Sequence, residues 1–305
     1  CGVHTDLIGF AASNEKGDWA GFDVDYCRAV AAAIFGDGTK VKFTPLSAKD
    51  RFPALQSGEV DVLIRYTTWT LGRDEHGFDF TGVNYYDGQS FMINAAKLPD
   101  VKSARQLSGA SVCVRSGTTT ELNLADYFKA NRMELKPVVF EKLEEANAAY
   151  NSGRCDAYVD SRSGLYSIRA TLAAPQDHVI LPEIISKEPI GPLVRQGDPQ
   201  WADVIRWTHE ALVTAEEMGI TQANVEEMAK SGNPEIQRVL GREANTRLGT
   251  DLGLGNDWVV NIVKAVGNYG EVFDRSLGAG SRLKIDRGIN DLWTRGGLQY
   301  GLPIR

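Results

Sequence analysis

The hydrophobic pattern of residues 41–64 predicts a strand, a helix and a second strand. In "VKFTPLSAKDRFPALQSGEVDVLI", residues 41–44 alternate between apolar and polar side chains, as a half-buried strand does. Residues 50–57 place apolar side chains at helical spacing, and Gly58 follows as a helix stop. Residues 60–64 are almost all apolar, which is typical of a parallel strand covered on both faces.

The same order of elements recurs further along the chain. "ASVCVRSG" (110–117) predicts a strand and a turn, and "KPVVFE" (136–141) and "CDAYVD" (155–160) predict two more strands. Helical periodicity covers residues 119–130 and 142–151. Two sets of such units indicate an α/β fold with two lobes rather than one long sheet.

Two extended segments separate these sets, "YYDGQSFMINA" (85–95) and "EIISKEPIGPLVRQGD" (183–198). If the chain leaves the first lobe in one segment and returns in the other, the two form a hinge. We therefore expect residues 1–90 and 190–305 in the first lobe and residues 91–189 in the second. A cleft between such lobes is a common place for a small ligand. The predicted helices of the first lobe include 199–218, 221–230 and a tail from about 241 onward.

Composition and charge narrow the range of partners. The chain has 305 residues, which is enough for two domains. Its net charge of −7 and isoelectric point near 5.3 argue against a nucleic-acid partner. No apolar run approaches the ~20 residues of a membrane span. Because the chain opens abruptly on "CGV", we expect that an upstream segment has been removed.

The cysteines bear on the compartment and on metal binding. None of the four has a CxxC or Cys/His spacing, so we expect no metal site. Three pairings are possible, and sequential pairing would give each half of the chain one disulfide in an oxidising compartment. Four free thiols in a cytosolic protein are the alternative. The cysteines are Cys1, Cys27, Cys113 and Cys155.

Residues 64–74, "IRYTTWTLGRD", combine the groups that hold a small anion. Thr68 and Thr70 supply hydroxyl groups, and Arg73 supplies a fixed cation. A strand end with a solvated arginine is the competing interpretation. A second candidate is "RSGTTTE" (115–121), where a strand would run into a helix start with free N–H groups. Simple capping of a surface helix would use the same residues.

Taken together, several stretches closely resemble the periplasmic solute-binding proteins of polar amino-acid ABC transporters, in particular the general L-amino-acid-binding branch. The resemblance covers essentially the whole chain, and the tail is particular to this longer branch. The matching stretches are "GFDVDYCRAVAAAIFGD" (21–37), "FPALQSGEVDVL" (52–63), "TTWTLGRD" (67–74), "SGTTTELNLADYF" (116–128), "LPEIISKEP" (181–189), "NDWVVNIVKAVGNYGEVFDRSLG" (256–278) and "LWTRGGLQYGLPIR" (292–305).

The resemblance implies two Rossmann-like lobes, joined by a two-strand hinge, that close on one amino acid without catalysis or cofactor. This is the type II periplasmic binding-protein fold, here with a helical C-terminal extension. The family's pattern implies that Arg73 binds the α-carboxylate of the ligand, helped by Thr68 and Thr70. Ser116 and Thr119 belong to the second-lobe turn that adds backbone amides. A monomer in the periplasm that delivers its ligand to the membrane permease of an ABC transporter is the expected setting.

Three positions depart from the family's pattern. An aspartate that binds the α-ammonium group should fall at 161, where this chain has Ser161, and Tyr66 and His4 replace other cleft residues. Asp160 is adjacent, but neighbouring residues of a strand point to opposite faces unless a bulge intervenes. A one-residue shift of the correspondence is also possible. We expect altered specificity, for a small polar or acidic carboxylate, with His4 and Arg162 as added donors.

Two alternative functions remain open at this stage. Some dehydratases share this fold, but an enzyme needs an acid/base pair in the cleft, and His4 is the only histidine expected near it. A binding protein that serves signalling instead of import would use the same closing lobes. Because a disulfide between the lobes would hinder closure, we predict the pairs Cys1–Cys27 and Cys113–Cys155, one within each lobe.

Overall fold

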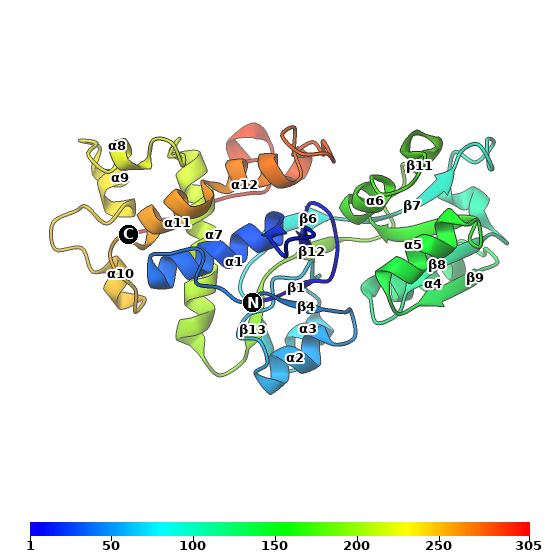
Figure 1. The fold of residues 1–305 in the computed structure, drawn as a ribbon, viewed down its shortest axis with the longest axis horizontal. Helices are drawn as coiled ribbons and strands as arrows, with labels where there is room; N and C mark the ends of the chain where they lie inside the picture. Colours follow the sequence, from blue (N-terminus) through cyan, green and yellow to red (C-terminus); the bar gives the residue numbers. More distant parts are fainter.

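The second lobe is built on a five-stranded sheet. The computed structural model describes residues 1–305, and the sheet has the order β11-β7-β10-β8-β9 (Figure 1). The strands β8, β9 and β10 are parallel, so their carboxyl ends lie at one edge. These strands are β7 (Gln89–Asn94), β8 (Ser111–Arg115), β9 (Lys136–Phe140), β10 (Ala157–Ser161) and β11 (His178–Ile180), and the helices around them are α4 (Thr119–Ala130), α5 (Leu143–Asn151) and α6 (Arg162–Arg169).

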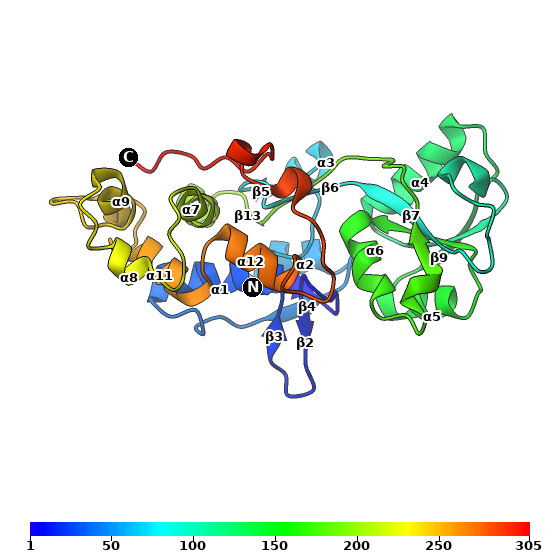
Figure 2. The same ribbon diagram turned by 90° about the horizontal axis from the view of Figure 1, so that it is seen from above.

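The first lobe contains a smaller sheet assembled from distant parts of the chain. Strand β1 (Gly2–His4) is parallel to β4 (Thr44–Leu46), and β13 (Leu193–Arg195) is antiparallel to β5 (Phe78–Phe80). Leu63 joins the two pairs through single bridges to Gly2 and Leu193. The helices of this lobe begin with α1 (Phe22–Phe35), α2 (Arg51–Ser57), α3 (Leu71–Asp74) and α7 (Pro199–Glu217), and a hairpin of β2 (Ala12–Ser13) and β3 (Trp19–Ala20) projects from it (Figure 2).

Helix α1 shows why this sequence folds locally as it does. It is rich in alanine and is almost entirely buried from Phe22 to Ala33. The preceding Gly21 has φ 135°, and an added Cβ would lie 2.2 Å from the carbonyl oxygen of Phe10. Only glycine fits there. Gly36 ends the helix in the left-handed conformation with φ 68°.

The two lobes are connected by the paired strands β6 (Tyr85–Asp87) and β12 (Glu188–Ile190). They are antiparallel, with Asp87 opposite Glu188 and Tyr85 opposite Ile190. The chain passes directly from β6 into β7 of the second lobe and from β12 back to β13 of the first. Both extended segments of the sequence therefore cross between the lobes, as the sequence pattern predicts.

The C-terminal extension is helical and packs on the first lobe. Helix α11 carries the "WVVNIVKAV" pattern and lies against α1 and α7, in agreement with the predicted helical tail. None of the helices combines the length and the apolar character needed to cross a bilayer. The helices of the extension are α8 (Val225–Met228), α9 (Pro234–Val239), α10 (Leu248–Asp251), α11 (Trp258–Val266) and α12 (Tyr269–Ser276).

Side chains of the extension hydrogen-bond to the backbone of the connecting strand. The Asn290 side chain accepts from the Tyr86 amide at 2.6 Å and donates to the Tyr86 carbonyl at 2.9 Å. The hydroxyl of Tyr269 donates to the Asn84 carbonyl at 2.9 Å. These contacts give the free edge of β6 the partners that a neighbouring strand would supply.

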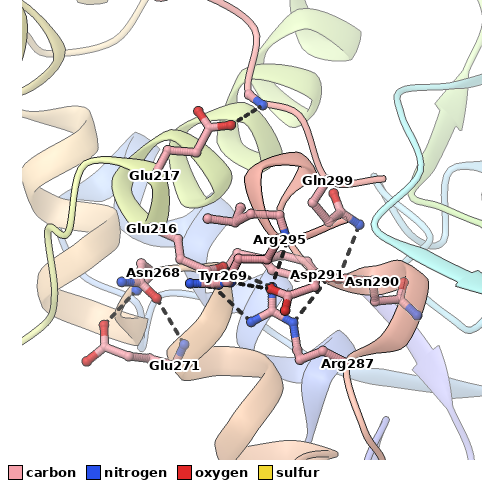
Figure 3. A network of polar contacts seen from close by, with 12 residues as sticks. Glu216, Glu217, Asn268, Tyr269, Glu271, Arg287, Asn290, Asp291, Arg295 and Gln299 are labelled. Atoms are coloured by element: carbon pink, nitrogen blue, oxygen red, sulfur yellow. Dashed lines mark hydrogen bonds and ion pairs between the residues drawn. The ribbon is translucent and has the colours of Figure 1, made fainter. Parts of the chain in front are cut away.

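An ion-pair network fixes this part of the extension (Figure 3). The guanidinium group of Arg287 donates to both carboxylate oxygens of Glu216 on α7, each at 3.1 Å. Arg295 also binds Glu216 and donates to Asp291 at 2.8 Å. Because Asn290 lies between Arg287 and Asp291 in sequence, the network positions the side chain that binds the hinge.

The cysteines form two disulfides, in the pairing predicted from the sequence. Cys1 is bonded to Cys27 with a Cα–Cα distance of 6.1 Å, and Cys113 is bonded to Cys155 at 5.6 Å. The first disulfide ties the start of β1 to α1, and the second ties β8 to the segment before β10. Each lies within one lobe.

Three predicted elements differ in extent. Residues 60 and 62–64 are buried as expected and Asp61 is exposed, but only Leu63 makes bridges to neighbouring strands, because the sheet around it is short. The strand predicted at 41–44 begins at Thr44, since that segment pairs with β1 only from Gly2 onward. The helix predicted at 221–230 is limited to Val225–Met228, because residues 221–224 form a turn before it.

Candidate ligand-binding site

A cavity lies between the two lobes and is lined by residues from both. The first lobe contributes the residues around α2, α3 and the segment after Ile64, and the second contributes the ends of β8 and β10 and the start of α4. This is the carboxyl edge of the parallel strands, where ligands of α/β folds bind. The lining residues are Arg51, Arg65, Tyr66, Thr68, Arg73, Arg115, Thr118, Thr119, Thr120, Asp160 and Ser161.

Arg73 is held in place by the short helix that carries it. Thr70 caps α3 and accepts from the backbone amide of Arg73 at 3.3 Å. The Arg73 guanidinium donates to the Thr68 carbonyl at 2.7 Å and lies 5.3 Å from the ring centroid of Phe52. Burial lowers the pKa of Arg73 to about 10, although the negative charge of Glu188 opposes the shift. The guanidinium group of Arg73 is therefore held in position, and its positive charge is only partly offset by Glu188.

Glu188, on the returning hinge strand, binds hydroxyl groups from both sides of the cavity. It is 1% exposed and accepts from Thr119 at 3.0 Å and from Thr68. Its other oxygen accepts from Asn123 at 3.3 Å and Ser186 at 3.0 Å. The hydroxyl of Thr68, predicted to assist Arg73, and that of Thr119, from the predicted second-lobe turn, are thus both engaged by this carboxylate, which the sequence pattern did not indicate.

Arg115 and Asp160 form a buried ion pair on the second-lobe wall. Their side chains are 2.8 Å apart, with side-chain exposures of 8% and 5%. Burial would lower the pKa of Arg115, but the charge of Asp160 outweighs it and the pKa is raised. Arg115 also donates to Nε2 of His4 at 3.1 Å. Because that nitrogen accepts, His4 is neutral, in keeping with a pKa lowered by burial and by neighbouring arginines.

Tyr66 connects the lobes at the hinge. Its hydroxyl donates to Asp87 at 2.9 Å, lies 2.6 Å from Ser163 Oγ and accepts from the Gly164 amide at 3.0 Å. Tyr66 has φ 47°, a left-handed conformation that costs about 1–3 kcal/mol in a bulky residue. Burial raises the pKa of Asp87 to about 6 despite its hydrogen bonds. The strained backbone of Tyr66 therefore occurs at the residue whose hydroxyl contacts both the hinge, at Asp87, and the second lobe, at Gly164.

Arg51 and Arg65 are two further cavity residues that the sequence analysis did not identify. Each is 3% exposed. Arg51 begins α2, and Arg65 directly follows the buried segment that ends at Ile64. A cation after a buried apolar strand was the available signal, because such a residue sits at the carboxyl edge of the sheet.

The residues predicted from the sequence divide into two groups. Thr68, Arg73, Thr119 and Ser161 line the cavity together with Tyr66 and Asp160. The others do not line it, and they are Thr70, which caps α3; Ser116, which bonds the Phe140 carbonyl; His4, which lies behind Arg115; and Arg162 at the start of α6. His4 accepts from Arg115 through Nε2, so this nitrogen is not the added donor expected.

Asp160 reaches the cavity without a bulge, contrary to the strand-face argument. The ladder with β7 is one-to-one, with Asp160 opposite Ser90 and Ser161 opposite Gln89. Both Asp160 and Ser161 nevertheless line the cavity. The alternation of faces ends here because Ser161 is the cap of α6 and the chain already turns out of the sheet.

Known proteins with similar sequences are periplasmic binding proteins. The general L-amino acid-binding periplasmic protein AapJ of Rhizobium johnstonii is 64% identical over 306 residues, covering 100% of this chain and 89% of AapJ. The glutamate/glutamine/aspartate/asparagine-binding protein BztA of Rhodobacter capsulatus is 53% identical over 307 residues, covering 100% of this chain and 90% of BztA.

A solved structure extends the likeness to three dimensions. An ABC transporter / periplasmic binding protein from Brucella ovis with glutathione bound is 71% identical, with a TM-score of 0.99. The match covers 100% of this chain and 95% of that one. Residues 1–224 match the model of the bacterial extracellular solute-binding proteins, family 3. The chain therefore belongs to family 3 of the bacterial extracellular solute-binding proteins.

Proposed function

We propose that this protein captures an amino acid or a related small carboxylate between its lobes and delivers it to an ABC importer. The observation that carries the proposal is a buried, cationic cavity lined by residues of both lobes. A ligand placed there contacts the two lobes at once, so its binding energy favours the closed form. AapJ and BztA, which are described as amino-acid-binding proteins, support the same class of ligand.

In this proposal, the cavity residues bind the two ends of an α-amino acid. Arg73 binds the α-carboxylate, supported by the free amides at the start of α4 near Thr119. Asp160, with the hydroxyl of Ser161 beside it, accepts from the α-ammonium group. Arg115 orients the carboxylate of Asp160 through a hydrogen bond of 2.8 Å.

The proposal includes the setting of the protein. Residues 1–90 and 190–305 form the first lobe, and residues 91–189 form the second. The protein works in the periplasm after removal of a signal segment, as a monomer that docks on a membrane permease. The two disulfides support this setting, as does the similarity to AapJ, a periplasmic protein.

We propose binding without catalysis. An enzyme of this fold would need a free acid or base beside the ligand. In the cavity, Asp160 is engaged by Arg115, and the neutral His4 lies behind that arginine. The similar proteins AapJ and BztA support binding as well, since both are described as binding proteins.

A thermal-shift screen tests the proposed function. Common L-amino acids, glutathione and small carboxylates without an ammonium group are each added to the purified protein. A ligand that binds only the folded protein raises Tm in a concentration-dependent way. At least one amino acid or small peptide should do so, with affinity confirmed by calorimetry. Absence of binding by every compound in refolded, ligand-stripped protein would refute the proposal.

A further inference from the structure

The cavity contains more positive charge than one amino-acid carboxylate can neutralise. Four arginines line it, but Asp160 is the only carboxylate among the lining residues. Asp160 is paired with Arg115, and Glu188 lies near Arg73. Arg51 and Arg65 form no ion pair, although both are 3% exposed.

The hydrogen-bonding groups of Arg51 and Arg65 are mostly free. Arg51 makes one long contact, of 3.5 Å, to the Gly117 carbonyl, and its Nε has no partner. Arg65 uses only its Nε, which donates to the Leu46 carbonyl at 2.8 Å. Its two terminal nitrogens make no hydrogen bond within the protein and are available to a ligand.

The surroundings make these charges costly when the cavity is empty. Burial, followed by the charges of neighbouring arginines, lowers the pKa of Arg51 well below its usual range and that of Arg65 to about 9. Asp23 is the nearest carboxyl to offset Arg65, but burial raises the pKa of Asp23 to about 7. Asp23 therefore supplies only part of a negative charge at neutral pH. Buried cations without a partner are strongly unfavourable, so an anion is expected beside them.

A larger space adjoins the cavity, which itself has a volume of only about 20 Å³ in this structure. An adjoining cavity of about 240 Å³ shares Arg65 and Arg115 with the main one. Its other lining groups carry both signs of charge and include His4 and Lys142 as well as the carboxylates Asp50, Glu141 and Glu144. Arg65 therefore lines both cavities, whereas Arg51 lines only the one that contains Arg73.

We propose that Arg51 and Arg65 form a second carboxylate subsite, so that the preferred ligand has a carboxylate at each end. Suitable ligands are an acidic amino acid or a small peptide with an α-amino acid at one end and a second carboxylate at the other. The inference rests on the proposed function. Glutathione, bound in the similar Brucella ovis protein, has two carboxylates and one ammonium group and fits this pattern. A neutral amino acid would leave both arginines unpaired.

Matched pairs of ligands test the subsite with the unmodified protein. L-glutamate is compared with L-glutamine, and glutathione with its glycine amide, by calorimetry at low ionic strength. Each pair differs only in whether the distal group is charged. A charged hydrogen bond is worth about ten- to a hundredfold in affinity, so the acid of at least one pair should bind at least roughly tenfold more tightly. Equal affinities within both pairs would overturn the inference and leave the proposed function standing.

Arginine variants then show which residues cause the preference for the acid over the amide. Arg51→Gln and Arg65→Gln should reduce the acid-to-amide ratio toward one, whereas Arg73→Gln should weaken both members of a pair and preserve their ratio. Arg206→Gln removes an exposed arginine of α7 and should change neither. If Arg51→Gln and Arg65→Gln fold, as judged by circular dichroism, and keep the wild-type ratio, the subsite is wrong. If these two variants fail to fold, the comparison of the ligand pairs with the unmodified protein decides whether the subsite exists.

Discussion

At the scale of single residues, Arg73 is the proposed anchor for the ligand. Its guanidinium group is fixed by the Thr68 carbonyl and the Phe52 ring, and it has no ion-pair partner within 4.0 Å. Replacing it by alanine removes a charged hydrogen bond to the ligand carboxylate. Arg73→Ala should therefore lower affinity by about one to two decades, measured by calorimetry.

The Arg73 experiment has a matched control on the surface. Arg206→Ala removes an arginine that pairs only with the exposed Asp203. It should bind ligand as wild type does, and both variants should unfold cooperatively without ligand. An Arg73→Ala protein with wild-type affinity for carboxylate ligands would show that the site lies elsewhere.

Asp23 is expected to make stability depend on pH. It is 1% exposed, its Oδ2 has no hydrogen-bond partner, and burial raises its pKa from 3.8 to about 7. Between these two pH values the folded protein retains a proton that the unfolded chain has lost. This contribution to the free energy of unfolding therefore falls as pH rises from about 4 to 7, by up to about 1.4 kcal/mol per pH unit.

The variant Asp23→Asn isolates this contribution. Denaturant unfolding of wild type and variant is measured across this range, and wild type should lose stability relative to the variant as pH rises. Asp286→Asn changes an exposed carboxyl group and serves as the control. Parallel stability curves for wild type and Asp23→Asn would contradict the prediction.

At the scale of elements, the Tyr66 hydroxyl links the hinge to α6. Tyr66→Phe removes the hydroxyl group that accepts a hydrogen bond from the Gly164 amide and donates one to Asp87. The Gly164 amide and the Asp87 carboxyl group then each lose one hydrogen-bond partner. The closed form should lose about 1–2 kcal/mol relative to the open form. We expect affinity to fall by roughly five- to thirtyfold, mainly through faster dissociation in stopped-flow measurements. Unchanged dissociation would show that this hydroxyl does not stabilise closure.

The hinge contact of Asn290 provides a second test at this scale. Asn290→Ala leaves the amide and carbonyl of Tyr86 without side-chain partners, which costs about 1–3 kcal/mol for buried groups. Denaturant unfolding should show this loss. Asn151→Ala, at an exposed asparagine at the end of α5, should change stability little. Equal stability of both variants would mean that water replaces the Asn290 amide.

The elements with a regular period were predictable from the sequence, and the convergence of side chains was not. Helix α4 has the bounds predicted for it, because its turn and apolar spacing are local properties. Arg73 could be predicted as a ligand-binding residue because three threonines lie just before it in the sequence. Arg65 lies in the same threonine-rich stretch and follows a buried strand, whereas Arg51 has no such local signal. An arginine in a helix or after a strand usually faces water, so neither was expected in the cavity. Their burial is a property of the folded tertiary structure and not of the local sequence.

Asp160 illustrates a different limit of the sequence argument. The rule that neighbouring strand residues face opposite sides holds only while the strand continues. Where β10 ends and α6 begins, Asp160 and Ser161 both line the cavity. The position of that boundary, to within one residue, decides whether this chain has an acceptor for the ligand's ammonium group.

At the scale of the whole molecule, each disulfide should stabilise its own lobe. The Cys113–Cys155 bond has a sequence separation of 42, for which the chain-entropy model gives about 4 kcal/mol. The double variant Cys113→Ser, Cys155→Ser should lose stability mainly in the second lobe, which hydrogen exchange can resolve. Equal loss of protection in the first lobe would show that the lobes unfold as one unit.

The contacts of the C-terminal extension with the hinge have a consequence for the order of folding. Elements β7 to β11 are contiguous in sequence, and one disulfide closes within them. The first lobe, in contrast, joins Tyr86 to Asn290 across 204 residues. Contacts of such long range form slowly because a large loop must close first. We therefore expect the second lobe to fold early while the first lobe waits for the final residues of the chain, so that the hinge is completed last.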